Sequence, residues 1–328
     1  MNIVRVPFRI SLFGGGTDFK YFYEKKNATV ISFTIDRYCY ITVRELLPFF
    51  KTKFRLSWSK IEEVADFNDF SHRSVKACLN FLKINDPLEI HTVGDLPARS
   101  GLGSSSAFTA AFLTSLALYR NESFTAEGIA KQTIFVEQEI LKENVGVQDQ
   151  IQVCHGGFNI TSIFNDSSYS ILSLNKSSTL VREIEESLVL VYTGIQRFSS
   201  EIHNKNFPKV SSQLREEALN RINYLALKFS DKLTNHRADF SLFVSLLNES
   251  WEAKSLTLLE GKNSDVLQSI YKKGLNSGAL CGKLLGAGGG GFFAFFVPPD
   301  HKISFMKKMS PLISLMPKIS FKGIEQVL

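Results

Sequence analysis

The chain has 328 residues, which is more than one core usually supports, so we expect two domains. Its hydrophobic fraction of 44% is ordinary for a soluble globular protein, and no apolar run approaches the roughly 18 residues that a membrane-spanning helix needs. The net charge of +6 suits a small anionic substrate, while the lack of any long run of like charges argues against nucleic acid as a partner.

The N-terminal segment and the cysteines indicate where the protein works in the cell and which kinds of site it lacks. The first ten residues, MNIVRVPFRI, lack the long apolar stretch and the small-residue cleavage site of a signal peptide, so we expect a cytoplasmic protein with no membrane partner. The four cysteines are scattered without C-x-x-C pairs or nearby histidines. This spacing predicts packed, reduced thiols and neither a disulfide framework nor a zinc site.

The hydrophobic pattern predicts a mixture of strands and helices. Runs rich in β-branched and aromatic residues predict strands over 28–35, 39–46, 87–93, 188–194 and 291–297. Helical apolar spacing predicts helices over 105–120, 125–144, 210–230, 239–258 and 264–277. The polar segment 165–178 predicts a hairpin before a boundary near 180–187, which divides the chain into domains 1–183 and 184–328. Because the second half is rich in helix and ends in strands, we expect an α+β fold.

The first of three glycine-bearing motifs is VPFRISLFGGGTDF, over 6–19. An apolar stretch runs into Gly15 and Gly16, which permit positive φ and the close approach of a ligand. Thr17 and Asp18 then supply a hydroxyl and a carboxylate, which are suitable partners for a polyol. A tight turn between two strands explains the same residues equally well, so both interpretations stay open at this point.

The second motif, GDLPARSGLGSSSAF over 94–108, leads from a loop directly into a predicted helix that its serines could cap. Gly101 and Gly103 let the backbone fold closely and aim N–H groups at an anion, and the helix dipole also favours negative charge there. The motif does not match the Walker A pattern G-x-x-x-x-G-K-[ST]. A serine-capped helix with a flexible entry is the alternative interpretation.

The third motif, KLLGAGGGGFFAFF over 283–296, satisfies G-x-G-x-x-G through Gly286, Gly288 and Gly291. A dinucleotide-binding fingerprint follows a strand and opens a helix. Here we expect a helix before the glycines and an aromatic strand after them. The motif therefore does not predict NAD binding, and taken alone it is a glycine-rich turn.

In this order the three motifs resemble those of the GHMP kinase superfamily, which includes galactokinases, homoserine kinases, mevalonate kinases and phosphomevalonate kinases. Within it, GGGTD (14–18) and VQDQ (147–150) look like the heptose 7-phosphate kinase branch, with fucokinase-type enzymes as near relatives. The resemblance implies an N-terminal α+β domain with the phosphate loop, a ferredoxin-like C-terminal domain, and an active site between them. It implies ATP and Mg²⁺ as cofactors, a sugar or sugar phosphate as substrate, and it is compatible with a homodimer.

The resemblance also implies a role for individual residues. Asp149 would accept or orient the proton of the acceptor hydroxyl, and Arg9 would stabilise charge beside it or serve in a structural ion pair. Mg²⁺ would contact Ser105 and Glu137, which lies twelve positions before Asp149. The residues expected to bind the ATP phosphates are Arg99, Ser100, Gly101, Leu102, Gly103, Ser104, Ser105 and Ser106. Those expected to bind the substrate are Gly15, Gly16, Thr17, Asp18, Gly286, Ala287 and Gly288.

One departure from galactokinases bears on the acceptor. Galactokinases have Glu-His before Thr-Asp, whereas this chain has Gly15 and Gly16. Losing two side chains opens room and removes a negative charge, which favours a larger or phosphorylated sugar over free galactose. Basic residues in plausible loops that could meet a substrate phosphate are Arg99, Arg197, His203 and Lys205, with Lys283 as a weaker phosphate candidate.

The reaction implied is transfer of the γ-phosphoryl group of ATP to the anomeric hydroxyl of D-glycero-D-manno-heptose 7-phosphate. Two alternatives stay open. One is an anomeric kinase for a free sugar such as fucose, and the other is a catalytically silent regulator that binds sugar and ATP.

Overall fold

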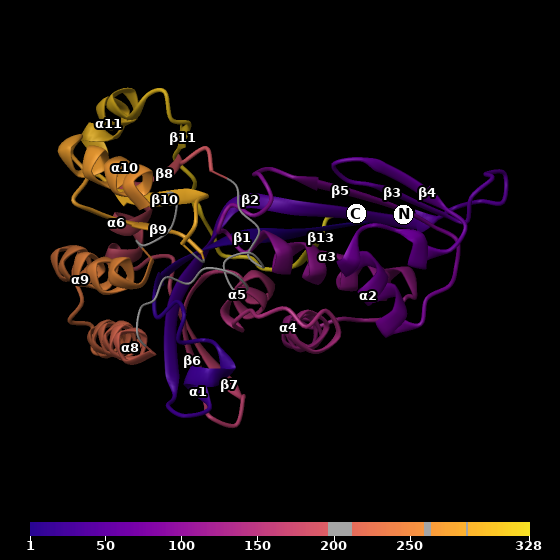
Figure 1. Ribbon diagram of the computed structural model, residues 1–328, viewed down its shortest axis with the longest axis horizontal. Coiled ribbons are helices and arrows are strands. Elements are labelled where there is room, and N and C mark those ends of the chain that lie inside the picture. Colours follow the sequence, from indigo (N-terminus) through magenta and orange to yellow (C-terminus); the bar gives the residue numbers. More distant parts are fainter. Residues whose placement is uncertain (196–211, 259–263, 287) are drawn as a thin grey trace.

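The computed structural model describes residues 1–195, 212–258, 264–286 and 288–328. Within these ranges the strands form a nine-stranded sheet and a four-stranded sheet. Figure 1 shows the larger sheet running along the long axis, with the orange and yellow helices of the C-terminal half gathered around the smaller sheet at one end. In the described part of the chain, no helix combines the length and apolarity that a membrane crossing requires.

Strands and helices are mixed along the chain without a regular βαβ repeat. The strands are β1 (Asn2–Phe13), β2 (Ala28–Glu45), β3 (Phe54–Ser57), β4 (Ile61–Val64), β5 (Leu88–Gly94), β6 (Phe158–Ile163), β7 (Tyr169–Leu174), β8 (Leu188–Tyr192), β9 (Cys281–Leu284), β10 (Phe292–Phe296), β11 (Ser314–Leu315), β12 (Ile319–Ser320) and β13 (Glu325–Gln326). The α-helices are α1 (Lys20–Tyr23), α2 (Arg73–Leu82), α3 (Ser104–Tyr119), α4 (Ala126–Phe135), α5 (Gln148–His155), α6 (Thr179–Ser187), α8 (Ser212–Thr234), α9 (Phe240–Leu258), α10 (Ser264–Asn276) and α11 (Lys302–Met309). Short helical segments of other types are η1 (Phe67–Asp69), η2 (Val136–Ile140, a π-helix) and η3 (Pro299–His301).

The large sheet is organised by the long strand β2. Its C-terminal half pairs with β5 and its N-terminal half with β6, while β1 runs antiparallel to both halves with register shifts near Arg9 and Phe13. The sequence predicted two separate strands over 28–35 and 39–46, and this was wrong because β2 runs through both ranges without a break. The polar residues between them stay extended because the backbone N–H of Asp36 donates to Lys318 O and β12 pairs with the adjacent stretch.

The small sheet has the strand order β11-β8-β10-β9, with antiparallel pairing throughout. Helices separate β8 from β9 and β10 from β11, which gives the βαββαβ succession of a ferredoxin-like domain. Alternation along β10 places Phe293 and Phe295 in one apolar cluster and Phe292 and Phe296 in another. The phenylalanines of this strand therefore pack both faces of the sheet.

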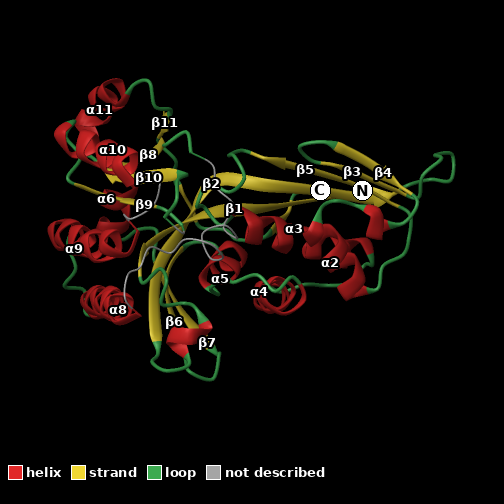
Figure 2. Ribbon diagram, in the orientation of Figure 1, coloured by secondary structure: helices red, strands yellow, loops and turns green. Residues whose placement is uncertain are grey.

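Helices α2 to α5 lie together along one face of the large sheet, where α3 packs against β1 and β2 (Figure 2). Most of the predicted helices are present near their expected bounds, but the one over 125–144 changes after residue 135 into the π-helical η2. The C-terminal segment of the chain returns to the large sheet, since β12 pairs with β2 and β13 with β1. The division at 183/184 stays a prediction, although these last strands lie in the sheet of the first half.

Candidate active site

A cavity of about 400 Å³ lies where the three glycine motifs meet. Its wall combines residues of the first motif, the phosphate loop over 99–106, the segment 143–149, helices α8 and α9, and the glycine loop that follows β9. Elements far apart in the sequence therefore contribute to one concave surface between the two sheets, which is where small-molecule sites commonly occur.

The phosphate loop has a backbone shaped for an anion. Arg99, Gly101 and Gly103 have φ values of 59°, 80° and 73°, so left-handed residues alternate with others along the loop. Such alternation turns successive N–H groups toward one concavity, and the N-terminus of the 16-residue helix α3 follows directly. Gly103 itself occupies the N-cap, and Ser104 Oγ accepts from the Arg99 N–H instead of capping the helix.

The glycine loop after β9 packs backbone to backbone on the phosphate loop. A β-carbon on Gly101 would come 2.5 Å from Leu285 O, and one on Gly286 would come equally close to the Gly101 Cα. These contacts explain why both positions are glycine. The expectation that a helix directly precedes this loop was wrong, because β9 precedes it. The loop joins two antiparallel strands. A dinucleotide fingerprint needs a helix after its glycines, and here a strand follows them, so the order of elements still does not match.

Arg9 and Asp149 form a bidentate ion pair in the cavity wall. Arg9, 3% exposed on β1, donates from Nε to Asp149 Oδ1 and from Nη2 to Oδ2, each at 2.7 Å. Its Nη1 donates to Gly101 O at 2.5 Å, and its backbone N–H donates to Leu102 O. A bidentate pair has a defined geometry. The arrangement therefore holds one carboxylate beside the phosphate loop at the start of α5.

Glu137 lies on η2 and is 1% exposed. Ser106 Oγ and Gln150 Nε2 donate to its Oε2, at 2.9 and 2.6 Å, whereas Oε1 has no hydrogen-bond partner among the described residues. Burial, followed by the charge of Glu143, raises the pKa of Glu137 to about 8. An unpaired carboxylate oxygen in the wall of the cavity, which exposed Ser105 also lines, fits a hard divalent cation.

The metal chemistry that fits is that of Mg²⁺. Among the described residues, no group of three or more His, Cys, Asp and Glu side chains could hold a metal ion. Mg²⁺ commonly takes one or two protein carboxylates and completes its coordination with substrate phosphates and water. A single unpaired carboxylate oxygen beside a phosphate loop agrees with that donor set.

Asp18 and Thr17 have different environments despite being neighbours. The Asp18 carboxylate, in the cavity wall, accepts from the N–H groups of Gly16 and Gln148 and from Gln148 Nε2. Burial and then the charge of Asp149 raise the pKa of Asp18, and the hydrogen bonds from the backbone N–H groups of Gly16 and Gln148 oppose this shift. Thr17 is fully buried outside the lining, and its hydroxyl donates to Gly14 O. Thr17 therefore closes the turn that presents Asp18.

The other predicted residues divide by position. Those that line the cavity are Gly15, Gly16, Arg99, Gly101, Gly103, Ser104, Ser105, Ser106, Gly286 and Gly288. Ser100 and Leu102 are buried parts of the loop whose residues do not line the cavity. Buried Lys283 donates to Leu12 O and does not reach the cavity. Those outside the described residues are Ala287, Arg197, His203 and Lys205.

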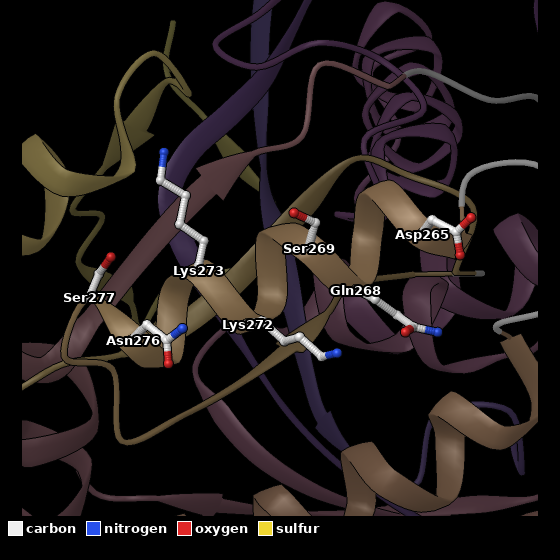
Figure 3. Close-up of a pocket in the computed structure, with 7 residues that line it drawn as sticks. All are labelled: Asp265, Gln268, Ser269, Lys272, Lys273, Asn276 and Ser277. Carbon is white, nitrogen blue, oxygen red and sulfur yellow. The ribbon is translucent and has the colours of Figure 1, made fainter.

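A second hollow, of about 640 Å³, lies on the surface of α10. Its lining residues all come from this helix and the residue after it, and their side chains spread along the helix without converging (Figure 3). Lys273 Nζ donates to the carbonyl oxygens of Met309 and Ser310. The hollow is a polar groove beside one helix and lacks the features of a catalytic site.

Comparison with known proteins gives a consistent result. The protein family described as "GHMP kinases N terminal domain" matches this chain over residues 72–157. The chain is 30% identical over 317 residues to D-glycero-alpha-D-manno-heptose 7-phosphate kinase of Campylobacter jejuni, covering 93% of this chain and 92% of that protein. The chain belongs to the GHMP kinase family.

Solved structures of GHMP kinases have the same architecture. The TM-score is 0.79, at 20% identity, to a D-glycero-D-manno-heptose 1-phosphate kinase from Bacteroides thetaiotaomicron, covering 100% of this chain and 99% of that one. It is 0.76, at 26% identity, to a putative sugar kinase from Campylobacter jejuni, covering 99% and 97%. The α+β fold expected from the sequence is confirmed.

Two basic residues of this GHMP kinase line the cavity without having been predicted. Lys254 on α9 donates from Nζ to Gly286 O at 2.9 Å, and burial, followed by the charge of Arg9, lowers its pKa to about 8. Arg215 on α8 lines the same cavity, to which the N-terminal half contributes Tyr21. Both lie on helices far along the chain from the motifs. The sequence does not show whether a single basic residue on a helix will lie in a cavity.

Proposed function

We propose that this chain is an ATP-dependent sugar kinase that phosphorylates the anomeric hydroxyl of D-glycero-D-manno-heptose 7-phosphate. The observation that carries the proposal is the Arg9–Asp149 pair beside an anion-shaped loop in one cavity. A carboxylate at that place can receive a hydroxyl proton, and the N–H groups of the loop can hold the phosphates. The family and the Campylobacter jejuni relative support the same chemistry.

The residues divide the work of phosphoryl transfer. The loop over 99–106 binds the phosphates, and Asp149 orients the acceptor hydroxyl and takes its proton. Arg9 holds Asp149 in place and offsets negative charge that develops nearby. Glu137 and Ser105 hold Mg²⁺, which when bound neutralises phosphate charge. The glycine loop closes the cavity from the C-terminal domain without filling it.

A phosphorylated acceptor is favoured by the wall near the first motif. Gly15 and Gly16 contribute no side chains to it, and Arg215 supplies a guanidinium suited to a phosphate. These features support heptose 7-phosphate over a free sugar.

The Arg215→Gln variant should lose much of its preference for the phosphorylated acceptor. We expect kcat/KM for heptose 7-phosphate to fall about tenfold, since a charge-assisted hydrogen bond is lost, and kcat/KM for the unphosphorylated heptose to change little. Steady-state kinetics with both acceptors measures this. The matched control is Arg221→Gln on the same helix, where the arginine pairs with Glu249 outside the cavity. Equal losses for both acceptors would place the substrate phosphate elsewhere.

The pH profile should report Lys254. Because its pKa is near 8, the side chain is charged below that pH and neutral above it. An ammonium group in the cavity favours anionic substrates, so kcat/KM should fall as the pH rises through about 8. The Lys254→Met variant should be about tenfold slower at pH 7 and lack this alkaline limb, while Lys272→Met on the exposed surface of α10 should keep it. An alkaline limb that persists in Lys254→Met would assign it to another group.

The proposed function itself is tested by ADP release from Mg-ATP with candidate acceptors. Heptose 7-phosphate should support rapid release, whereas fucose, mannose, galactose and a no-sugar control should not. Preference for a free sugar would contradict the proposal that the acceptor is phosphorylated, while the proposal of a sugar kinase would stand. Binding of ATP and sugar without any ADP release would indicate the silent regulator.

A further inference from the structure

Besides Glu137 Oε1, two buried side-chain oxygens of residues that line the cavity lack a hydrogen-bond partner among the described residues. They are Ser11 Oγ on β1, whose residue is 5% exposed, and Gln148 Oε1 on α5. A buried polar atom without a partner costs folding free energy. When such atoms face a cavity, a ligand group that completes their hydrogen bonds is the physical explanation to test.

The two side chains approach one another at Gly15. A β-carbon on Gly15 would lie 3.1 Å from Ser11 Oγ, 3.6 Å from Gln148 Nε2 and 4.0 Å from Gln148 Oε1. Its neighbours Gly14 and Gly16 have φ values of 79° and 102°, but Gly15 is not among the residues with positive φ. The backbone at Gly15 therefore has no conformational need for glycine. What a side chain would take away is the space between the Ser11 hydroxyl and the Gln148 amide.

The orientation of Gln148 determines which ligand group fits. Its Nε2 donates to Asp18 Oδ1 at 3.2 Å, and its backbone N–H donates to Asp18 Oδ2. The amide oxygen is thereby left to accept a hydrogen bond from the cavity. The Ser11 hydroxyl can donate as well as accept. An alcohol satisfies both groups, because it gives its proton to Gln148 and accepts from Ser11, whereas an ionised phosphate oxygen has no proton to give.

We propose that Ser11, Gly15 and Gln148 form a subsite for a second hydroxyl of the acceptor, distinct from the one that is phosphorylated. Gln148 directly precedes Asp149, so the subsite holds the polyol beside the carboxylate that orients the reacting hydroxyl. Ser11 and Gln148 are binding residues in this account, and Gly15 provides room. The proposal rests on the sugar-kinase function and specifies how that site selects a polyhydroxylated acceptor.

The test uses two single substitutions with matched controls. Gly15→Ala places a methyl group where the hydroxyl would lie, and Ser11→Ala removes one of its partners. Each should raise KM for heptose 7-phosphate about tenfold, as expected for the loss of one hydrogen bond, and leave KM for ATP within about twofold. Gly128→Ala on α4 is the control for the first, because its β-carbon would also meet a hydroxyl, Thr125 Oγ1, at 3.0 Å.

Ser314→Ala is the control for the second substitution. Ser314 Oγ is likewise buried without a partner among the described residues, but it lies on β11 and outside the cavity. Both controls should match the wild type in both KM values. Acceptor KM values that are unchanged in Gly15→Ala and Ser11→Ala, with an active wild type, would overturn the subsite alone. A wild type that releases no ADP with any sugar would overturn the proposed function and the subsite with it.

A panel of monodeoxy acceptors sharpens the result. For the analogue that lacks the recognised hydroxyl, the wild type should already show the raised KM, and Ser11→Ala should raise it no further. Every other analogue should keep the full effect of Ser11→Ala. If the Ser11→Ala effect is the same for all of the analogues, Ser11 does not contact an acceptor hydroxyl and the proposal fails.

Discussion

The Asp149→Asn variant is expected to bind ATP as the wild type does and to turn over roughly 10²–10⁴-fold more slowly, the usual range for losing a positioned general base. Asparagine has the size of aspartate and can still accept from Arg9 through its one oxygen. It replaces the second acceptor of the bidentate pair with an amide group, and it cannot take a proton. The kcat from ADP release and the ATP affinity from calorimetry separate the two effects.

The control for this variant is Asp166→Asn, in the turn of the β6–β7 hairpin, where the carboxylate accepts from the backbone N–H and the hydroxyl of Ser168. It should have normal kcat and normal ATP binding. If Asp149→Asn also turns over at the wild-type rate, Asp149 does not take part in the reaction, and the Arg9–Asp149 pair serves structure alone.

The Glu137→Gln variant should need about tenfold or more Mg²⁺ for half-maximal activity. The amide oxygen can occupy the place of Oε2 and still accept from Ser106 and Gln150. The NH₂ group then takes the place of the unpaired Oε1, and an amide nitrogen does not ligate Mg²⁺. Binding of Mn²⁺ followed by electron paramagnetic resonance should weaken in parallel, which gives a measurement independent of turnover.

Glu139→Gln is the matched control, because Glu139 lies on the same π-helical segment but is exposed and pairs with Lys20 and Lys142. Its metal titration should follow that of the wild type. A Glu137→Gln variant with an unchanged Mg²⁺ titration and unchanged Mn²⁺ binding would remove Glu137 from the metal site.

The parts of the site that the sequence predicts are those encoded in a short stretch of chain. The phosphate loop and α3 are contiguous, so glycine spacing followed by an apolar helix was enough to indicate an anion site at the start of a helix. The two strands on either side of the glycine loop, β9 and β10, show the limit of this approach. The strand β9 is only four residues long and was missed, although β10 was predicted.

The remaining parts depend on contacts between distant segments. Lys254 lies on a helix whose apolar spacing predicts α9 but not the direction of one lysine. Ser11 lies within a strand, and only the contact between β1 and the start of α5 shows that its hydroxyl and Gln148 border one space. Glu143 was not predicted as a site residue, yet it follows η2 in the chain and lines the cavity.

Phosphorus NMR of the product mixture from Mg-ATP and D-glycero-D-manno-heptose 7-phosphate tests the proposed reaction most directly. The expected spectrum contains ADP and a second sugar phosphate resonance coupled to the anomeric proton, in equal amounts. This would establish both the transfer and the hydroxyl that receives the phosphoryl group. ADP with inorganic phosphate alone, or a new phosphate on another carbon, would contradict the account of Asp149 and the cavity given above.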